Sequence, residues 1–331
     1  MERLGIGLGR NYEMGPEEFA SHIQYAESLG YDTAVVPEAW GRDAMVKLGH
    51  LAARTERIKL LTGIVTVWSR SPTMLAMAAA TVDEISKGRL ILGVGVTGPK
   101  VVEDWHGGKW EKPLQRTREY IDIIRLVVGG KRVNYDGYFF HLKDFRIQFE
   151  PYRDRIPLYI GAVGPKNLQL TGEIADGWVS MEVVWENLPN FLAEIKKGAD
   201  GVGRKLDGFD VTAGVQVCFG SDRAAVKKLL QQDMAYRMGG LGPFHYGAIA
   251  RQGFEKECAK IKKLWAEFKR AEAAAAVTDE MLEKTAYMGD GAGAKKHIEQ
   301  LRKAGVKLPV IHLPKGVTHD MIRTTMKTMA S

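Results

Sequence analysis

Cysteine is scarce in this chain of 331 residues, and long apolar runs are absent. Cys218 and Cys258 lie far apart without CxxC spacing, which excludes a disulfide framework or a cysteine-based zinc site and favours a reducing cytoplasm. No apolar segment approaches the roughly 18 residues that a membrane helix needs. Because Met1 leads almost directly into a strand-like segment, we expect no secretory signal peptide and a cytoplasmic protein without membrane contacts.

The motifs of several common chemistries are also missing. The eight histidines show no metal-ligand spacing, and the chain has no GxSxG elbow and no Cys–His pair, so we expect neither a metal nor a covalent nucleophile. Residues 93–98 match GxGxxG, but Pro99 and a further stretch precede the next helix at Pro113. A dinucleotide fingerprint opens its helix directly, so a Rossmann-type site is not predicted.

The formal net charge of +7 is concentrated at Lys227, Lys228 and residues 256–270. Basic and apolar residues alternate there at helical spacing, which is typical of a solvated helix face. Aromatic residues do not interleave with them as they do on nucleic-acid surfaces, so we predict no nucleic-acid partner. A basic field still favours a polyanionic small molecule as a ligand.

The chain does contain a regular alternation of strand-like and helix-like segments. Eight apolar segments, each followed by an amphipathic one, are predicted as strands at residues 3–8, 33–36, 58–67, 90–94, 158–160, 178–181, 211–219 and 308–312. Strands that are apolar throughout are buried on both faces, which indicates a parallel sheet. Eight such units predict an α/β fold, a (β/α)8 TIM barrel that forms one domain over residues 1–331.

Two regions exceed the minimal barrel. Residues 132–149 are rich in aromatic side chains and polar turns, and they predict a hairpin or extended loop inserted before the fifth strand. Residues 239–287, after the seventh strand, begin with a glycine-rich segment that predicts a mobile hinge before a basic, alanine-rich helix. Long insertions in barrels often serve as lids or interfaces.

Residues 156–178 form the most informative segment of the chain. They predict a short buried strand, a turn over 161–164, and a helix with Pro165 at its first position, where a missing N–H costs nothing. Free backbone N–H groups at the positive end of a helix dipole can hold a phosphate, and Lys166 would add a charge-assisted contact. An ordinary strand-to-helix turn is the alternative.

In a (β/α)8 barrel the active site lies at the carboxyl ends of the strands. That rule selects polar, aromatic and glycine residues after seven of the eight predicted strands. They are Arg10, Asn11 and Tyr12; Glu38, Trp40 and Arg42; Thr66, Trp68, Ser69 and Arg70; Thr97, Gly98 and Lys100; Gly164 and Lys166; Glu182; and His312.

Four segments in the same order resemble those of a known family. They are residues 58–66 with 71–72, residues 83–95, residues 110–114, and residues 161–166 with 172–177. On these segments the chain resembles the bacterial-luciferase-like superfamily, and within it the branch that uses the deazaflavin coenzyme F420. That branch includes methylenetetrahydromethanopterin reductase. The likeness spans residues 3 to about 220 and is weaker beyond.

The resemblance implies a set of coenzyme-binding positions. A non-prolyl cis peptide in strand three props the ring from behind in this family, and Gly63–Ile64 falls at that place, with Thr66 at the same strand end. The loop from Val96 to Val101 matches the segment that lines the coenzyme's side chain. The turn after strand five matches the site of the tail phosphate. The excess of basic over acidic residues suits a polyglutamate tail. The implied residues are Gly63, Ile64, Thr66, Thr97, Gly98, Pro99, Lys100, Gly161, Ala162, Val163, Gly164 and Lys166.

Glu38 stands where many relatives carry an acidic residue beside the deazaflavin. We interpret it as the proton donor or acceptor coupled to hydride transfer, with Trp40 walling the substrate beside the ring. Glu103 and His106, in the loop after strand four, are the fallback acids. The alternative is structural: Glu38 pairs with Arg42 at the surface and Trp40 packs under the long insertion.

The chain departs from the methylenetetrahydromethanopterin reductases at three acidic positions. Residues 7–8 replace a glutamate near the end of strand one, residues 97–100 lack an acid, and residues 38–39 replace an Asp-His pair. A pterin hydride acceptor needs a nearby acid to assist iminium formation, so the substrate stays open. The resemblance implies an oxidoreductase that moves hydride between C5 of coenzyme F420 and an organic small molecule.

Two other functions fit the same fold. One is an FMN-dependent luciferase-like monooxygenase, which would need a reductase partner and a shielded pocket for the oxygen adduct. The other is a flavin-binding protein without turnover. For each of them, as for the F420 enzyme, we expect a homodimer or higher homo-oligomer.

Overall fold

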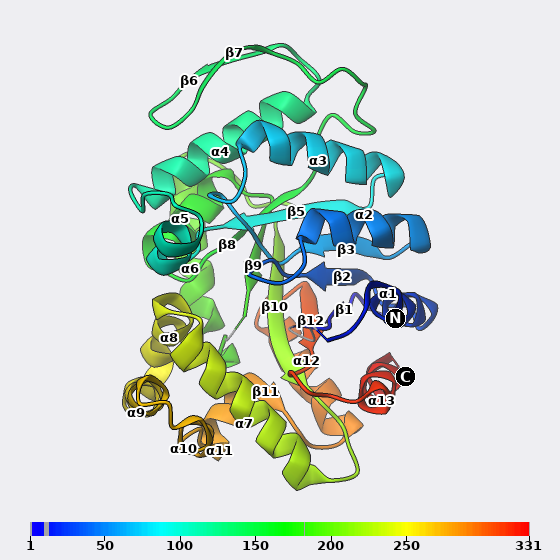
Figure 1. Ribbon diagram of the computed structural model, residues 1–331, viewed down its shortest axis with the longest axis vertical. Coiled ribbons are helices and arrows are strands. Elements are labelled where there is room, and N and C mark those ends of the chain that lie inside the picture. The colour runs from blue at the N-terminus through cyan, green and yellow to red at the C-terminus, as the bar shows by residue number, and fades with distance from the viewer. Residues whose placement is uncertain (1, 10–12, 182, 331) are drawn as a thin grey trace. The chain divides into compact units, whose positions relative to one another are not determined.

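The computed structural model describes residues 2–9, 13–181 and 183–330 (Figure 1). The chain forms two compact units. Unit 1 comprises Met1–Tyr31, Ser180–Ala193 and Asp210–Ser331, and unit 2 comprises Asp32–Val179 and Glu194–Phe209. Each unit has its own run of parallel strands, as the uniformly apolar strand segments predict.

Unit 2 is built on parallel strands in the order β2-β3-β5-β8-β9. These are β2 (Thr33–Val36), β3 (Lys59–Thr62), β5 (Leu90–Gly95), β8 (Leu158–Gly161) and β9 (Gly177–Ser180), and the short β4 (Val65–Thr66) also pairs with β5. The register places Val35 opposite Leu61 and Leu92 opposite Leu158. All four side chains are buried, so these strands form part of the core.

The helices of unit 2 follow the strands as predicted. They are α2 (Ala44–Arg54), α3 (Pro72–Ile85), α4 (Pro113–Val128), α5 (Pro165–Ile174) and the part of α6 (Leu188–Gly201) that lies in this unit. Asp43 and Ser71 cap α2 and α3 by accepting hydrogen bonds from N–H groups of the first turn. Three of these helices begin with proline, which is tolerated at a first helical position.

Unit 1 contains four parallel strands in the order β11-β10-β12-β1. They are β1 (Gly5–Gly7), β10 (Asp210–Val217), β11 (Ala286–Tyr287) and β12 (Leu308–His312). Helices α1 (Pro16–Ser28) and α13 (His319–Ala330) match the prediction, as does α7 (Arg223–Gly240). Strand β11 and helix α12 (Gly291–Lys303) were not predicted. The amphipathic pattern of α12 follows directly on the long insertion.

The first insertion is an antiparallel hairpin of β6 (Val133–Asp136) and β7 (His141–Phe145), which confirms the hairpin interpretation (Figure 1, top). Glu119 on α4 holds its turn. One carboxylate oxygen accepts from the backbone N–H of Tyr138 at 2.9 Å, and the other accepts from Phe139 at 2.8 Å.

The second insertion differs from the single helix that the sequence suggested. Four helices occupy it: α8 (Pro243–Ile249), α9 (Glu255–Ala266), α10 (Arg270–Ala275) and α11 (Asp279–Thr285), with the π-helical turn η3 (Ala250–Phe254) between α8 and α9. Gly239 and Gly240 belong to α7 and pack against Trp265, so the expected hinge does not begin there. Cys258 and Ile261 point from α9 into a buried apolar cluster.

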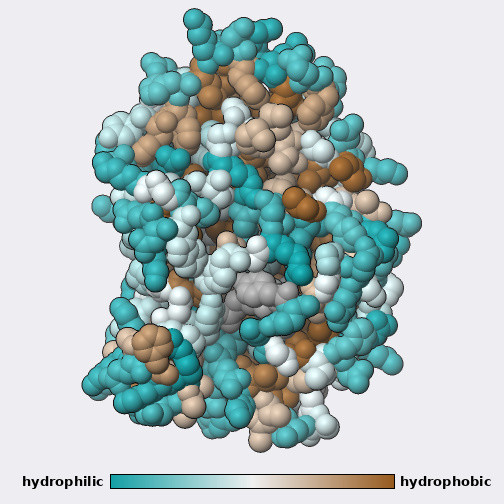
Figure 2. Space-filling model, in the orientation of Figure 1, coloured by the Kyte–Doolittle hydropathy of each residue, from teal (hydrophilic) through white to brown (hydrophobic). Residues whose placement is uncertain are grey.

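The basic side chains of α9 face solvent, as the helical spacing predicted. Lys256, Lys260, Lys262 and Lys263 are all exposed. Figure 2 is largely hydrophilic at the lower left, where Figure 1 labels this helix. Both cysteines are free and buried. Among the described residues, no helix is both long enough and apolar enough to span a membrane.

Candidate functional site

A cis peptide bond joins Gly63 to Ile64, where the third strand is interrupted between β3 and β4. The predicted cis bond at an irregularity of this strand is confirmed. A Cβ atom at Gly63 would clash with Cγ1 of Val35 on the neighbouring strand β2. Glycine is therefore required here by the close approach of the two strands.

The side chain of Ile64 lies against the ends of two further strands. An added Cβ atom would come within 3.1 Å of Ile64 at Gly161 on β8, and within 3.3 Å of it at Gly95 on β5. The register pairs Thr66 with Gly95 and Gly95 with Gly161, so these residues lie in one row at the carboxyl ends of the strands. Ile64 is half-buried and occupies the space that side chains at Gly95 and Gly161 would need, so its close approach to these two strands depends on the glycines.

Two buried polar atoms at this edge have no hydrogen-bond partner among the described residues. They are Oγ1 of Thr66 and Oδ1 of Asn167. The amide nitrogen of Asn167 donates to the carbonyl of Gly161 at 3.4 Å, which orients its free oxygen. Buried polar groups in proteins are normally hydrogen-bonded, so these two atoms fit a polar ligand at the strand ends.

The N-terminus of α5 has the properties expected of an anion site. Gly164 is its N-cap in extended conformation, and no described side chain caps the helix. No atom of the described chain lies within 4 Å of the position that a Cβ of Gly164 would take, and Lys166 is exposed in the first turn. The strand, turn and helix with Pro165 at its first position are confirmed.

The segment after β5 is partly helical, in contrast to the predicted loop. Val101–Trp105 forms a π-helical turn (η1), in which Val101 and Val102 donate to the carbonyl of Gly98 at 3.0 and 3.3 Å. Thr97, Gly98 and Pro99 are half-buried before it, and Lys100 is exposed. Both fallback acids are exposed; Glu103 accepts from the backbone N–H of Trp110 at 3.2 Å, and His106 follows the turn.

Glu38 forms a bidentate ion pair with Arg70. Its two oxygens accept from Nη1 and Nη2 of Arg70 at 2.7 and 2.8 Å, and the side chains are 11% and 19% exposed. The backbone N–H of Ala44, at the start of α2, also donates to Glu38 at 3.1 Å. Arg70, which follows strand three, is therefore the partner of Glu38. The alternative stated from the sequence was a pair with Arg42.

Asp43 completes this charge cluster from the N-cap of α2 by accepting a hydrogen bond from Arg70. The bond with Glu38, the largest influence, raises the pKa of Arg70 above its ordinary value, and Asp43 adds to the effect. Burial raises the pKa of Asp43, but the N–H of Val46 and the Arg70 guanidinium outweigh burial and lower it. Arg70 and Asp43 thus favour each other's charged forms.

Four tryptophans lie in two pairs within unit 2. Trp40, 42% exposed, meets the edge of Trp105 with ring centroids 4.9 Å apart. Trp68 and Trp110 stack at 4.8 Å, and the guanidinium of Arg116 lies 5.3 Å from the Trp68 ring. These rings supply flat apolar surface, and two of them, Trp40 and Trp68, are close in sequence to Glu38 and Arg70.

The remaining sequence-predicted candidates lie elsewhere. Arg10, Asn11, Tyr12 and Glu182 fall outside the described residues. His312 is buried at the end of β12 in unit 1, where its ring occupies the space that a side chain at Gly7 would need. All the other selected positions belong to unit 2.

The luciferase-like monooxygenase profile matches residues 4–308. The chain belongs to this family. A Mycobacterium tuberculosis protein that carries the name of a coenzyme F420-dependent oxidoreductase is 35% identical over 93% of this chain and 94% of its own. The 5,10-methylenetetrahydromethanopterin reductase of Archaeoglobus fulgidus is 33% identical over 90% of each chain.

The luciferase-like family accounts for the architecture as well. The structure of the coenzyme F420-dependent tetrahydromethanopterin reductase from Methanopyrus kandleri is similar, with a TM-score of 0.83 and 26% identity over 100% of this chain and 98% of that one. The fold is the (β/α)8 barrel of this family, and its prediction from the sequence is confirmed.

Several residues of this luciferase-like site escaped the sequence analysis. Trp105 and Trp110 lie after strand four, where neither side chain was selected as a site residue, and Arg116 lies on α4. Asn167 follows the selected Lys166 directly, and its side chain is the one that turns back toward the strand end. Four tryptophans in the segments that follow strands two, three and four were a visible signal, because only seven occur in the chain.

Proposed function

We propose that this protein is a coenzyme F420-dependent oxidoreductase that transfers a hydride between C5 of the deazaflavin and an organic small molecule. Relatives of 35% and 33% identity are named for that coenzyme or for a reductase of the F420 branch. The observation that carries the proposal is the row of Ile64, Gly95 and Gly161 beside the uncapped N-terminus of α5.

The chain's own groups fit the coenzyme in two ways. The cis-linked Gly63 and Ile64, with Thr66, would support the ring, because the half-buried Ile64 lies against Gly95 and Gly161 at the carboxyl ends of β5 and β8. The turn from Gly161 through Ala162 and Val163 to Gly164 would hold the tail phosphate on free N–H groups, with Lys166 adding a positive charge. Thr97, Gly98, Pro99 and Lys100 would line the side chain between them.

When bound, the coenzyme supplies a two-electron hydride donor or acceptor. The protein's part is then position and electrostatics. Glu38, held in its bidentate pair with Arg70, would accept a proton or stabilise positive charge next to the ring. Trp40, with Trp105 at its edge, would exclude water from the substrate, and Glu103 and His106 are the exposed groups that could exchange protons with solvent.

The structure bears on the pterin substrate named for two of the relatives. The resemblance implies a glutamate near the end of strand one in those reductases, but at Gly7 the ring of His312 closes the space beside the backbone, and Leu8 is fully buried. An acid cannot be supplied from this position. We therefore propose a substrate that needs no such acid. We also propose that the protein is a cytoplasmic homo-oligomer in which each chain forms one domain.

Titration of the protein with coenzyme F420 and with FMN, side by side, tests the proposal. We expect tighter binding of F420 and reduction or oxidation of the bound deazaflavin by a suitable substrate. Tighter binding of FMN would instead favour a luciferase-like monooxygenase. A bound coenzyme whose redox state no donor or acceptor changes would leave only a binding role.

Gly164→Val tests the phosphate position. The substitution should fill the open space at the N-terminus of α5 and weaken F420 binding at least about tenfold, about 1.4 kcal/mol. Gly15→Val is the matched control, because Gly15 is also an extended N-cap before a proline, with no described atom within 4 Å of its Cβ position. Equal losses in both variants, or none at Gly164, would place the phosphate elsewhere.

A further inference from the structure

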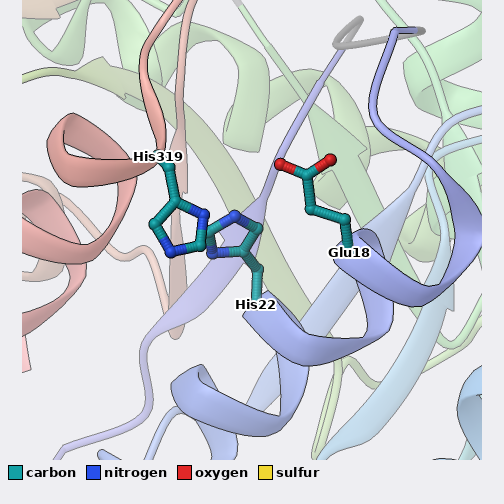
Figure 3. A group of neighbouring side chains, drawn as sticks. All are labelled: Glu18, His22 and His319. Atoms are coloured by element: carbon teal, nitrogen blue, oxygen red, sulfur yellow. The ribbon is translucent and has the colours of Figure 1, made fainter.

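Three potential metal ligands gather in unit 1, remote in sequence from one another (Figure 3). Glu18 and His22 lie one turn apart on α1, and His319 is the first residue of α13. One ligand atom from each lies within 4.8 Å of the others. The two imidazole rings lie with centroids 4.5 Å apart and their planes tilted by 49°.

His22 has an unusual environment for a histidine. Its side chain is fully buried, and neither Nδ1 nor Nε2 has a hydrogen-bond partner within residues 2–9, 13–181 and 183–330. A buried polar atom left unpaired is costly, so such groups usually mark a bound water, an ion or a functional site. Its two neighbours in the cluster, Glu18 and His319, are both exposed.

The charges around His22 favour its neutral form, which is the form that binds metals. Burial, and next the neighbouring His319, lower the pKa of His22 to about 4. Arg323 on α13 acts in the same direction, and Glu18 opposes them. Arg323 is itself engaged with the ring of Tyr25 at 3.8 Å, and the carboxylate of Glu18 supplies the negative charge that a cation would need.

We propose that Glu18, His22 and His319 bind a divalent transition-metal ion of the Zn²⁺ type. Two imidazoles and one carboxylate are a ligand set that Zn²⁺ uses, with a water in the fourth position. Ligand atoms on a tetrahedral Zn²⁺ lie about 3.4 Å apart, given bonds of about 2.1 Å. The ligand atoms, now within 4.8 Å of one another, can come closer if the exposed side chains of Glu18 and His319 rotate while buried His22 stays fixed.

The ion would join α1 to α13, and so the two ends of the chain. An ion that binds the folded chain but not the unfolded chain would stabilise the protein against unfolding. Sequence spacing predicted no metal, because Glu18 and His22 form only a two-residue pattern and the third ligand is 297 positions away. The inference does not depend on the proposed redox function.

The test uses the full chain without a histidine tag, freed of metal by a chelator and then dialysed. Zn²⁺ is titrated in competition with a chromogenic chelator, and the melting temperature is followed with Zn²⁺ and with Mg²⁺. We expect one Zn²⁺ per chain, a rise in melting temperature with Zn²⁺ but not with Mg²⁺, and visible d–d bands when Co²⁺ is bound instead.

His319→Ala and Glu18→Gln are the test variants, since both side chains are exposed and their loss should leave the fold intact. Each should weaken Zn²⁺ binding at least about tenfold, about 1.4 kcal/mol. The control is His141→Ala, which removes an exposed histidine paired with a single carboxylate, Asp136, at 2.6 Å. Unchanged affinity in His319→Ala, or no stoichiometric binding by the unmodified protein, would overturn the proposal.

Discussion

At the scale of single residues, the ion pair of Glu38 and Arg70 is the feature that most constrains the candidate site. A bidentate contact between side chains that are 11% and 19% exposed fixes the orientation of both groups. The hydrogen bond from Ala44 ties the carboxylate to the start of α2 as well. A group held so firmly can act on a ligand without first being ordered, which is what preorganised electrostatics requires.

Glu38→Gln should lower turnover by about 10²–10⁴ if this carboxylate takes part in proton transfer. Coenzyme affinity should change by no more than a few fold, because the residues proposed to bind F420 lie elsewhere in unit 2. The measurements are steady-state kinetics and coenzyme titration.

The control for this variant is Asp43→Asn. Asp43 also accepts a hydrogen bond from Arg70, but it is 42% exposed, and asparagine caps a helix about as well as aspartate. Its turnover should stay near that of the unmodified protein. Full activity in Glu38→Gln would make the ion pair structural, and equal losses in both variants would point to Arg70 rather than to the carboxylate.

At the scale of elements, a buried carboxylate of α4 holds the backbone of the turn between β6 and β7. Glu119 is 6% exposed and accepts both backbone N–H groups of the turn. Glu119→Ala should destabilise the hairpin by about 2–4 kcal/mol, because two charge-assisted hydrogen bonds are lost and two donors lose their acceptor. Hydrogen exchange at Tyr138 and Phe139 should accelerate accordingly.

Glu150→Ala is the matched control for the hairpin. Glu150 is 89% exposed and lies 3.7 Å from Arg146, so its removal should change stability by less than about 0.5 kcal/mol. If the exchange of Tyr138 and Phe139 is the same in Glu119→Ala as in the control, the turn is held by other contacts.

Helices α5 and α6 approach through glycine. A Cβ at Gly172 would overlap the carbonyl of Ile195, and one at Gly198 would overlap the carbonyl of Gln169. Gly198→Ala should therefore cost about 3 kcal/mol or more in the free energy of unfolding, since backbone on both sides must move. Gly201→Ala on the same helix, with no described atom near its Cβ position, should be neutral or stabilising by up to about 1 kcal/mol. Urea unfolding of both variants distinguishes local packing from helix propensity.

At the scale of the whole molecule, the net charge of +7 bears on coenzyme binding. A basic protein attracts an anionic ligand over distances that salt screens, and the Debye length falls from about 10 Å at 0.1 M salt to about 3 Å at 1 M. The affinity for F420 with its polyglutamate tail should fall several-fold between these conditions. A deazaflavin without the tail should lose less, and equal losses for the two ligands would contradict a role for the overall charge.

The sequence by itself determined the eight strands of the barrel, their parallel arrangement and the barrel family. These follow from short-range patterns: apolar runs of strand length, amphipathic helices, and prolines at first helical positions. The cis bond between Gly63 and Ile64 could also be predicted, because residues 58–66 carry the family resemblance. Local propensity and burial act over a few residues, so a single chain displays them directly.

Only the tertiary structure decided which side chains meet. Arg70 rather than a nearer residue was found to hold Glu38, 32 positions away, and His22 meets His319 at the other end of the chain. The division of the second insertion into four helices was likewise settled by packing around Cys258 and Ile261. Such pairings depend on how whole elements dock and which rotamers the neighbours allow, and that information is spread over the chain rather than written at any one position.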